Sequence, residues 1–204
     1  MYFLRRLLTF IAGVLLSAGG LAASGPLGID HRLNYDDSGI WDRKVQLATL
    51  NALMIADVAG ALWEGSDSRL GKTFWYSIDS TLIGSVSVET LKRVFGRERP
   101  RNTSNPNEWA DGASFPSGEV TAMTAIVTPF ILEYRHDHPA VYALELLPLY
   151  DGIARMKVWG HWQTDVLAGF AIGTTVSIIM HSQDTPLFVS WLPDGIGVGV
   201  KKRF

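Results

Sequence analysis

Cysteine is absent from this chain of 204 residues. Its absence excludes disulfide bridges, a thiolate nucleophile and a zinc site built on sulfur. An excess of positive charge is missing as well, because 18 lysine and arginine side chains stand against 20 acidic ones, which argues against a nucleic-acid partner. With 47% hydrophobic residues and no covalent bridges, the fold must be stabilised by the packing of a hydrophobic core.

The first 23 residues have the order of regions that is typical of a secretory signal peptide. Two arginines precede the apolar run 7–16, and small residues follow up to Ala23. Without this segment, residues 24–204 form one domain with 16 basic and 20 acidic side chains, a net charge of −4. We therefore expect an exported protein, periplasmic or envelope-associated. An uncleaved amino-terminal membrane anchor is the alternative, and it also exports the domain.

The rest of the chain has the apolar spacing of helices. Apolar residues in runs, or three to four positions apart, predict helices over 46–63, 77–95, 120–134, 140–156 and 165–180. The polar stretch 102–114 is expected to be a loop, and 135–139 a helix connection. After Pro186 the pattern favours a short C-terminal β-hairpin or extended tail. The predicted fold class is therefore all-α, a single-domain bundle of five or six core helices.

Charged residues argue against membrane spans. A span needs about 20 mostly apolar residues. Asp57 interrupts the first predicted helix, Glu89 and Lys92 interrupt the second, and Glu145 interrupts the fourth. Within residues 24–204, only 166–183 lacks a formally charged residue over a comparable length. We therefore favour a water-soluble bundle with peripheral membrane contact, and an integral membrane protein stays the alternative.

Three short stretches carry residues suited to binding phosphate, and the first is KRVFGRERP, residues 92–100. Lys92 offers a compact charge, and the planar fork of Arg99 can meet two phosphate oxygens at once. Pro100 prevents the helix from continuing, so Arg99 is expected on its exit turn. Five cations lie between positions 92 and 101, a density that predicts an anion-binding surface. Ordinary surface charge, or a salt bridge with Glu89 or Glu98, is the alternative for both residues.

The second stretch is PSGE, residues 116–119, directly before a predicted helix. The first N–H groups of a helix lack internal partners, and the helix dipole favours negative charge there. Ser117 and Gly118 are therefore expected to bind phosphate through a hydroxyl and backbone N–H groups. Simple capping of the helix by Ser117 is the alternative.

The third stretch is RMKVWGHWQTD, residues 155–165. His161 and Asp165 are four positions apart, so in a helix they share a face and the carboxylate can hold one ring nitrogen. A neutral imidazole held in this way can attack phosphorus and form a phosphohistidine. Arg155 can bind the same phosphate. Taken alone, His161 would be interpreted as a capping or core histidine, but its neighbours favour a nucleophile.

Together the three stretches resemble the signature of the phosphatidic acid phosphatase type 2 superfamily, which includes acid, lipid and polyprenyl phosphatases and vanadium haloperoxidases. That signature has a lysine, six intervening residues and Arg-Pro, then Pro-Ser-Gly-His, then Ser-Arg, five residues, a histidine, three residues and an aspartate. The matching residues here are Lys92, Arg99, Pro100, Pro116, Ser117, Gly118, Arg155, His161 and Asp165. The resemblance implies an all-helical bundle with the site at one end. The chemistry needs no metal or other cofactor, because fixed cations and helix-end N–H groups bind the phosphate.

Two positions depart from the signature. Glu119 stands where the family has the histidine that protonates the leaving oxygen, and Ala154 stands where it has a serine. An ordinary glutamate, with a pKa of about 4.3, is ionised at neutral pH and donates no proton. Nearby cations lower its pKa whereas burial raises it, so the sequence leaves the direction open. The loss of one hydroxyl at Ala154 is expected to weaken phosphate binding only modestly.

Three functions follow from these residues. We favour an exported phosphatase that hydrolyses a phosphomonoester or diphosphate, lipid, polyprenyl or small and soluble, through a phosphohistidine on His161. Glu119 would serve as the acid or as an activator of water. The alternative is a pseudoenzyme that binds phosphate or a lipid head group, because losing general-acid catalysis costs about 10²- to 10⁴-fold in rate. A vanadate-dependent haloperoxidase is less favoured, since Glu119 replaces the residue expected to assist peroxide.

Overall fold

The computed structural model describes residues 25–183 and 186–187. This part contains five α-helices, α2 (Arg43–Glu64), α3 (Arg69–Phe95), α4 (Gly118–Tyr134), α5 (Leu146–Lys157) and α6 (Gln163–His181), and two 3₁₀ helices, η1 (Gly39–Trp41) and η2 (Pro139–Glu145). Within those residues there is no β-strand, and an isolated antiparallel bridge joins Arg97 to Trp109 in a loop. The all-α prediction is confirmed. The predicted signal peptide and the predicted C-terminal hairpin or tail lie outside the described residues.

The largest differences from the predicted helices lie at the start of α3 and before α5. Helix α3 begins eight residues earlier than expected, because Ser68 caps it and its hydroxyl accepts the N–H of Gly71 at 2.9 Å. The range predicted as one helix over 140–156 is divided into η2 and α5. Pro148 lies in the first turn of α5, where a missing N–H removes no helical hydrogen bond.

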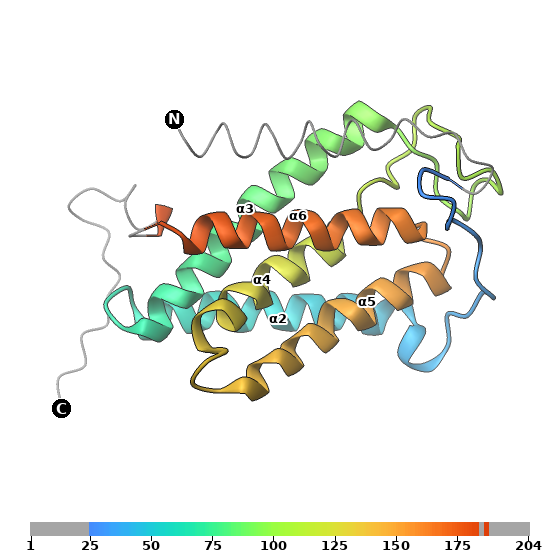
Figure 1. Cartoon of the computed structure of the whole chain (residues 1–204). Coiled ribbons are helices and arrows are strands. Elements are labelled where there is room, and N and C mark those ends of the chain that lie inside the picture. Colours follow the sequence, from blue (N-terminus) through green and yellow to red (C-terminus); the bar gives the residue numbers. More distant parts are fainter. Residues whose placement is uncertain (1–24, 184–185, 188–204) are drawn as a thin grey trace.

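Helix α4 lies at the centre of the bundle and packs mainly against α3 and α6 (Figure 1). All of its residues from 120 to 129 are buried, as expected for a helix that is apolar on every side. The largest core cluster joins α3 to α6 and consists of Val88, Leu91, Ile172, Val176, Ile179 and Met180. This core fixes α3 and α6 relative to one another.

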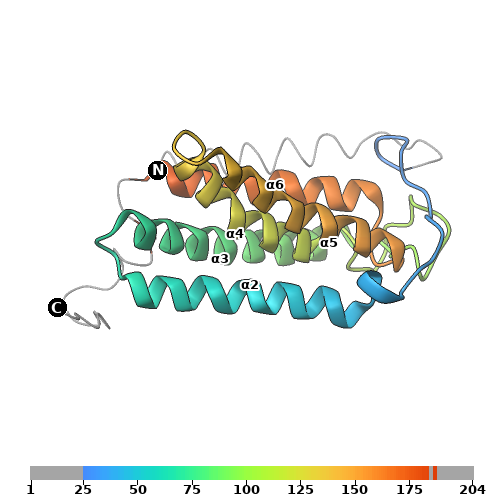
Figure 2. The same cartoon turned by 90° about the horizontal axis from the view of Figure 1, so that it is seen from below.

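Helix α2 is an outer helix (Figure 2). Much of its apolar surface is exposed, namely Val45, Leu47, Met54, Ile55, Val58, Leu62 and Trp63. The carboxylate of Asp57 points inward instead, where it is buried and accepts a hydrogen bond from the Ser77 hydroxyl at 2.8 Å. The interruption by Asp57 is therefore no argument against lipid contact on the outer face. By length and composition alone, α2 and α6 are apolar enough to cross a membrane, although 56% of the α6 window is buried in the bundle and only 17% of the α2 window.

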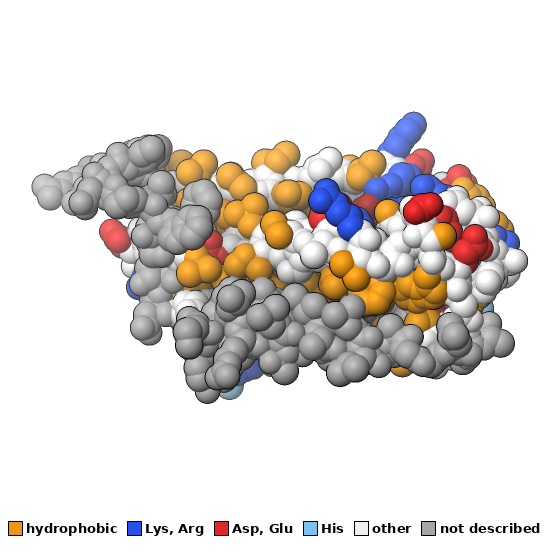
Figure 3. Space-filling view, turned by 90° about the horizontal axis from the view of Figure 1, so that it is seen from above, with side chains coloured by type: hydrophobic (Ala, Val, Ile, Leu, Met, Phe, Trp, Pro, Cys, Tyr) orange, Lys and Arg blue, Asp and Glu red, His pale blue; other side chains and the backbone are white. Residues whose placement is uncertain are grey.

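The connections that carry the three motifs meet at one end of the bundle. The segment 25–42, the loop 96–117 and the turn between α5 and α6 lie together there (Figure 1). Seen from above, charged side chains gather mostly toward this end, whereas hydrophobic side chains cover much of the remaining visible surface (Figure 3). Gly96 ends α3 in a left-handed conformation, with φ of 56°, and turns the chain into the loop.

Candidate functional site

His161 lies in the connection between α5 and α6, two residues before α6 begins. Its side chain is buried, and ring atom Nδ1 is 2.7 Å from the carbonyl oxygen of Ser114 and 3.7 Å from Oδ2 of Asp165. Because a carbonyl only accepts, Nδ1 carries the proton and donates it. Among the described residues, no hydrogen bond occupies the other ring nitrogen, Nε2. Asp165 neighbours the ring as its spacing predicts, but a backbone carbonyl of the loop is the closer partner.

The electrostatic surroundings keep the imidazole of His161 neutral. Burial lowers its pKa to about 4, and the charges of Arg155 and Arg99 act in the same direction. Asp165 opposes this shift without reversing it. A neutral ring with a proton on Nδ1 has its lone pair on Nε2, which is the form required of a nucleophile.

Asp165 belongs to a buried polar network. Its Oδ2 accepts the backbone N–H of Trp162 at 2.8 Å and the hydroxyl of Ser114 at 2.5 Å. Its Oδ1 lies 2.6 Å from Nη1 of Arg97. Burial alone would raise the pKa of Asp165, but the contact with His161 and the charge of Arg97 hold that pKa below its usual range. The carboxylate therefore stays ionised and fixes the start of α6 to the loop that holds His161.

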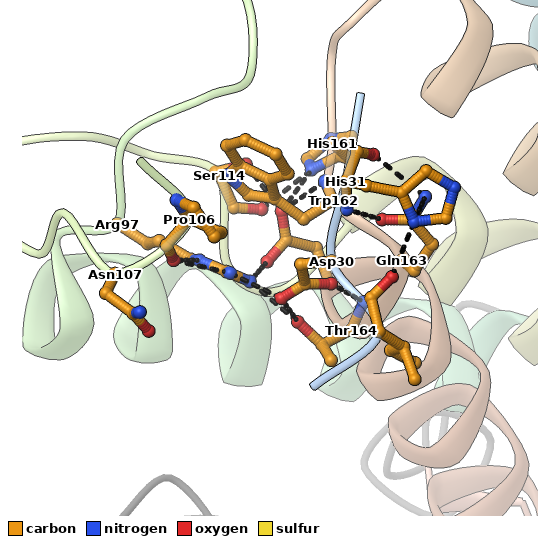
Figure 4. A network of polar contacts seen from close by, with 12 residues as sticks. Asp30, His31, Arg97, Pro106, Asn107, Ser114, His161, Trp162, Gln163 and Thr164 are labelled. Atoms are coloured by element: carbon orange, nitrogen blue, oxygen red, sulfur yellow. Dashed lines mark hydrogen bonds and ion pairs between the residues drawn. The ribbon is translucent and has the colours of Figure 1, made fainter. Parts of the chain in front are cut away.

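Arg97 is fully buried and has a structural role. Its Nη2 lies 2.6 Å from Oδ2 of Asp30 and donates to the carbonyl of Pro106, while Nη1 reaches Asp165 and the hydroxyl of Thr164 (Figure 4). In the sequence, Arg97 is one of the five cations predicted to form an anion-binding surface. That assignment is wrong, because two buried carboxylates already neutralise it.

The N-terminus of α4 presents an unpartnered hydroxyl. Ser117 is the residue before the helix, but its side chain makes no capping hydrogen bond, and its buried Oγ has no partner. Lys92 approaches the same helix end, since its Nζ would lie 3.4 Å from a Cβ atom placed on Gly118. The ammonium group also contacts the exposed Glu89 at 3.0 Å. The arrangement therefore combines an unused hydroxyl, a helix N-terminus and a cation.

Arg99, Arg155 and Glu119 line a cavity of about 480 Å³ at this end of the molecule. Arg155 is buried, and its Nε atom has no hydrogen-bond partner. Its Nη2 would be only 2.5 Å from a Cβ atom at position 160, so Gly160 is required for the guanidinium to lie there. Burial lowers the pKa of Arg155 to about 10, which leaves the side chain charged at neutral pH.

Glu119 forms a two-point ion pair with Arg43, a residue of α2 that sequence analysis did not identify. Both carboxylate oxygens are 2.5 Å from guanidinium nitrogens of Arg43, and Nε of Arg155 is 3.9 Å away. Burial by itself raises the pKa of Glu119, but the hydrogen bonds from Arg43 and the charge of Arg155 outweigh it and lower the pKa. The sequence left the direction of the Glu119 pKa shift open, and in the structure this pKa is lowered, so Glu119 is ionised at neutral pH.

The structure brings the predicted residues to one end of the bundle. Arg99, Glu119 and Arg155 share the cavity. Lys92 lies on α3, Gly118 and Asp165 lie in the first turns of α4 and α6, and Ser117 and His161 lie in the segments that precede these two helices. Sequence reasoning missed Asp30, Arg43 and Ser114, which no motif marks. A tetrahedral oxyanion in this place would meet three cations and several unpaired donors. In the described part of the chain, no three His, Asp or Glu side chains are grouped as metal ligands.

The fold and the site are those of an all-α protein that has a cavity lined by arginines and a buried, neutral histidine at one end of its helical bundle. Residues 73–187, more than half of the chain, match the PAP2 superfamily. The chain therefore belongs to the PAP2 superfamily, which confirms the resemblance inferred from the motifs. No solved structure matches the chain.

The chain is also similar to proteins named lipid A 1-phosphatase. It is 28% identical over 148 residues to that of Porphyromonas gingivalis, which covers 71% of this chain and 32% of the relative. It is 28% identical over 112 residues to that of Rhizobium etli, covering 51% of this chain and 47% of the relative. The matched region thus spans about a third to about a half of the length of these relatives.

Proposed function

We propose that the chain is a membrane-associated phosphatase that removes phosphate from a phosphorylated lipid through a phosphohistidine on His161. The observation that carries this proposal is a set of unused groups at one place. The hydroxyl of Ser117 and Nε of Arg155 are buried without a hydrogen-bond partner among the described residues, and Nε2 of His161 is left free by the bond from Nδ1 to Ser114. Buried donors without acceptors are costly, so they indicate an acceptor that binds there.

The phosphate would be bound by charge and by backbone N–H groups. Lys92, Arg99 and Arg155 supply three positive charges, and the N-terminus of α4 supplies the unpaired N–H groups that follow Ser117 and Gly118. Arginine forks at Arg99 and Arg155 suit the oxygens of a tetrahedral group. These fixed cations stabilise the negative charge that spreads over the phosphoryl oxygens during transfer.

In the reaction that we propose, Nε2 of His161 attacks phosphorus and the bond to the leaving oxygen breaks. Asp165 and the Ser114 carbonyl hold the ring in the tautomer that leaves Nε2 unprotonated. Water then attacks the phosphohistidine, phosphate is released, and the neutral ring is restored. An ionised Glu119 suits the second step, where a carboxylate can accept a proton from the attacking water.

A lipid substrate is supported by the surface of α2 and by the relatives. Helix α2 presents a long apolar face away from the bundle, and its N-terminal residue, Arg43, lines the cavity. A lipid layer against that face would place a phosphorylated head group near the site. The matched relatives are named lipid A 1-phosphatases, so lipid A is the first substrate to test. The predicted signal peptide, 1–23, would place the site on the outer side of the cytoplasmic membrane.

One observation favours a second function, that of a pseudoenzyme. The ion pair between Arg43 and Glu119 keeps a negative charge beside the place of the phosphate and leaves Glu119 without a proton to donate. A chain with this pair would bind a phosphorylated head group, but its turnover would be about 10²- to 10⁴-fold slower than that of an enzyme with a general acid.

The two functions are separated by assaying the full chain in detergent with p-nitrophenyl phosphate and with lipid A. We expect turnover by the unmodified chain, a loss of at least about 10³-fold in His161→Ala, and no loss in the control His136→Ala, an exposed histidine on the α4–η2 connection. Radioactive phosphate should be trapped on histidine. No turnover by the unmodified chain, with activity gained in Glu119→His, would establish the pseudoenzyme. Full activity of His161→Ala would refute the nucleophile.

A further inference from the structure

The first turn of helix α2 adjoins the cavity and carries two polar residues that belong to none of the three motifs. Arg43 lines the cavity, and Gln46, three positions further on, is fully buried. Residues three apart on a helix lie on the same face. Both precede residues 73–187, the region matched to the superfamily. This turn is therefore a part of the site to which neither the motifs nor the family match assigns a role.

Gln46 joins two guanidinium groups. Its Nε2 donates a hydrogen bond to the carbonyl of Trp41 at 2.7 Å, and since a carbonyl only accepts, Oε1 is the atom that faces the cations. Oε1 accepts from Nη1 of Arg43 at 3.2 Å and from Nη1 of Arg155 at 3.4 Å. One buried amide oxygen thus holds the two arginines close to each other.

The carboxylate of Glu119 lies next to the same two arginines. Arg43 binds both of its oxygens, through Nη1 and Nη2, at 2.5 Å each. Oε1 is also 3.9 Å from Nε of Arg155, an atom without a hydrogen-bond partner among the described residues. That distance is too long for a hydrogen bond. Arg155 is therefore close to the carboxylate but not bound to it.

Glu119 is in a position to compete with phosphate for Arg155. Arginine binds a carboxylate and a phosphate in the same two-point geometry. A partly buried carboxylate that loses its charge partner is unfavourable, so without Arg43 it would pair with the nearest unpaired donor, Nε of Arg155. Such a pair would take away one of the cations that the phosphate needs.

We propose that Arg43 is a positioning residue, which holds the carboxylate of Glu119 away from Arg155 and so keeps Arg155 available to phosphate. The inference rests on the proposed function, in which Arg155 binds the phosphate. It also explains how the site accommodates an acidic residue where the signature has a histidine. The charge of Glu119 is already neutralised by a cation that comes from outside the three motifs.

A double-mutant cycle of Arg43 and Glu119 tests the inference. Binding of inorganic phosphate is measured by calorimetry at neutral pH, in detergent, for the full unmodified chain, Arg43→Ala, Glu119→Gln and the double variant. We expect Arg43→Ala to weaken phosphate binding by about 10-fold, because the released carboxylate pairs with Arg155. Glu119→Gln alone should change binding by less than about 2-fold. In the double variant it should restore binding to within about 2-fold of the unmodified chain.

The matched control is Lys44→Ala, which removes an exposed cation from the neighbouring position on α2. It should change phosphate binding by less than about 2-fold, because an exposed charge is screened by solvent and salt. Two results of the cycle overturn the inference. If Arg43 binds phosphate itself, the double variant stays as weak as Arg43→Ala. If the two residues act only through their net charge, Glu119→Gln strengthens binding equally with and without Arg43.

Measuring turnover of p-nitrophenyl phosphate by the same variants separates this inference from the proposed function. If residues 43 and 119 are coupled in phosphate binding but the chain has no turnover, the proposed function fails while the role of Arg43 stands. Turnover by a chain in which the two effects on binding are additive gives the reverse conclusion. A chain that binds no phosphate overturns the inference whatever its activity.

The test does not depend on the folding of one variant. Thermal denaturation of each variant is measured first, and Arg43→Gln, which keeps a long side chain without its charge, replaces Arg43→Ala if the latter does not fold. Glu119→Gln by itself also decides the matter. An increase of about 10-fold in phosphate affinity in this single variant would show that Arg43 does not restrain Glu119, and would overturn the inference.

Discussion

Two arginines separated by a single residue have different roles in this protein. Arg97 is completely buried between the carboxylates of Asp30 and Asp165, whereas Arg99 lines the cavity. In the sequence both belong to the same cluster of cations. Only the loop that follows Gly96 decides which guanidinium turns inward, so composition alone could not separate the structural cation from the one available to a ligand.

The buried position of Arg97 predicts a large effect on stability. We expect Arg97→Ala to lower the free energy of unfolding by about 3–5 kcal/mol, because it leaves two buried carboxylates without their partner. Arg93→Ala, which removes an exposed arginine of α3, should change it by less than about 0.5 kcal/mol. Chemical denaturation of the purified chain measures both. Equal effects of the two substitutions would contradict the role of Arg97 as a buried ion-pair partner.

Residues that carry a chemical motif were identified from the sequence, and their supporting residues were not. Spacing within the third motif indicated Arg155, His161 and Asp165, and the structure places them around one helix start. The partner of the imidazole is a backbone carbonyl at Ser114, which no side-chain pattern can mark. Arg43 meets Glu119 across 76 positions, and a contact of that range depends on how α2 packs against α4.

At the scale of elements, apolar spacing predicted the helices well and their ends less well. The helices exist because their apolar faces pack around α4, and that pattern is written in the sequence. Ends depend on single capping groups, such as the Ser68 hydroxyl, and on the choice between 3₁₀ and α geometry in 139–157. These are small local energies that a periodic pattern does not record.

The outward face of α2 predicts binding to lipid. The double substitution Ile55→Ser and Val58→Ser replaces two exposed apolar side chains, so it should weaken co-sedimentation with phospholipid vesicles while leaving stability nearly unchanged. Leu50→Ser, on the buried face of the same helix, should instead lower stability by about 2–4 kcal/mol. Vesicle binding and thermal denaturation are measured for both variants. Unchanged vesicle binding of the double variant would contradict lipid contact at this face.

At the scale of the whole molecule, the site is assembled from segments distant in the sequence. The stretch 25–42, the loop after α3, the start of α4 and the turn before α6 converge at one end of the bundle (Figure 1). The all-helical bundle with its site at one end was foreseen through the family resemblance. The contribution of the first stretch was not, because Asp30 belongs to no motif and is recruited only through the burial of Arg97.

The ion pair between Asp30 and Arg97 limits how far the protein can be shortened at its N-terminus. A fragment trimmed to 73–187, the region matched to the superfamily, would retain every signature residue and yet lack both Asp30 and Arg43. Arg97 would then keep only one of its two carboxylate partners, and Glu119 would lose the guanidinium group of Arg43. Expression of residues 73–187 alone should therefore give an insoluble or inactive polypeptide, whereas expression of residues 24–204 should give folded protein.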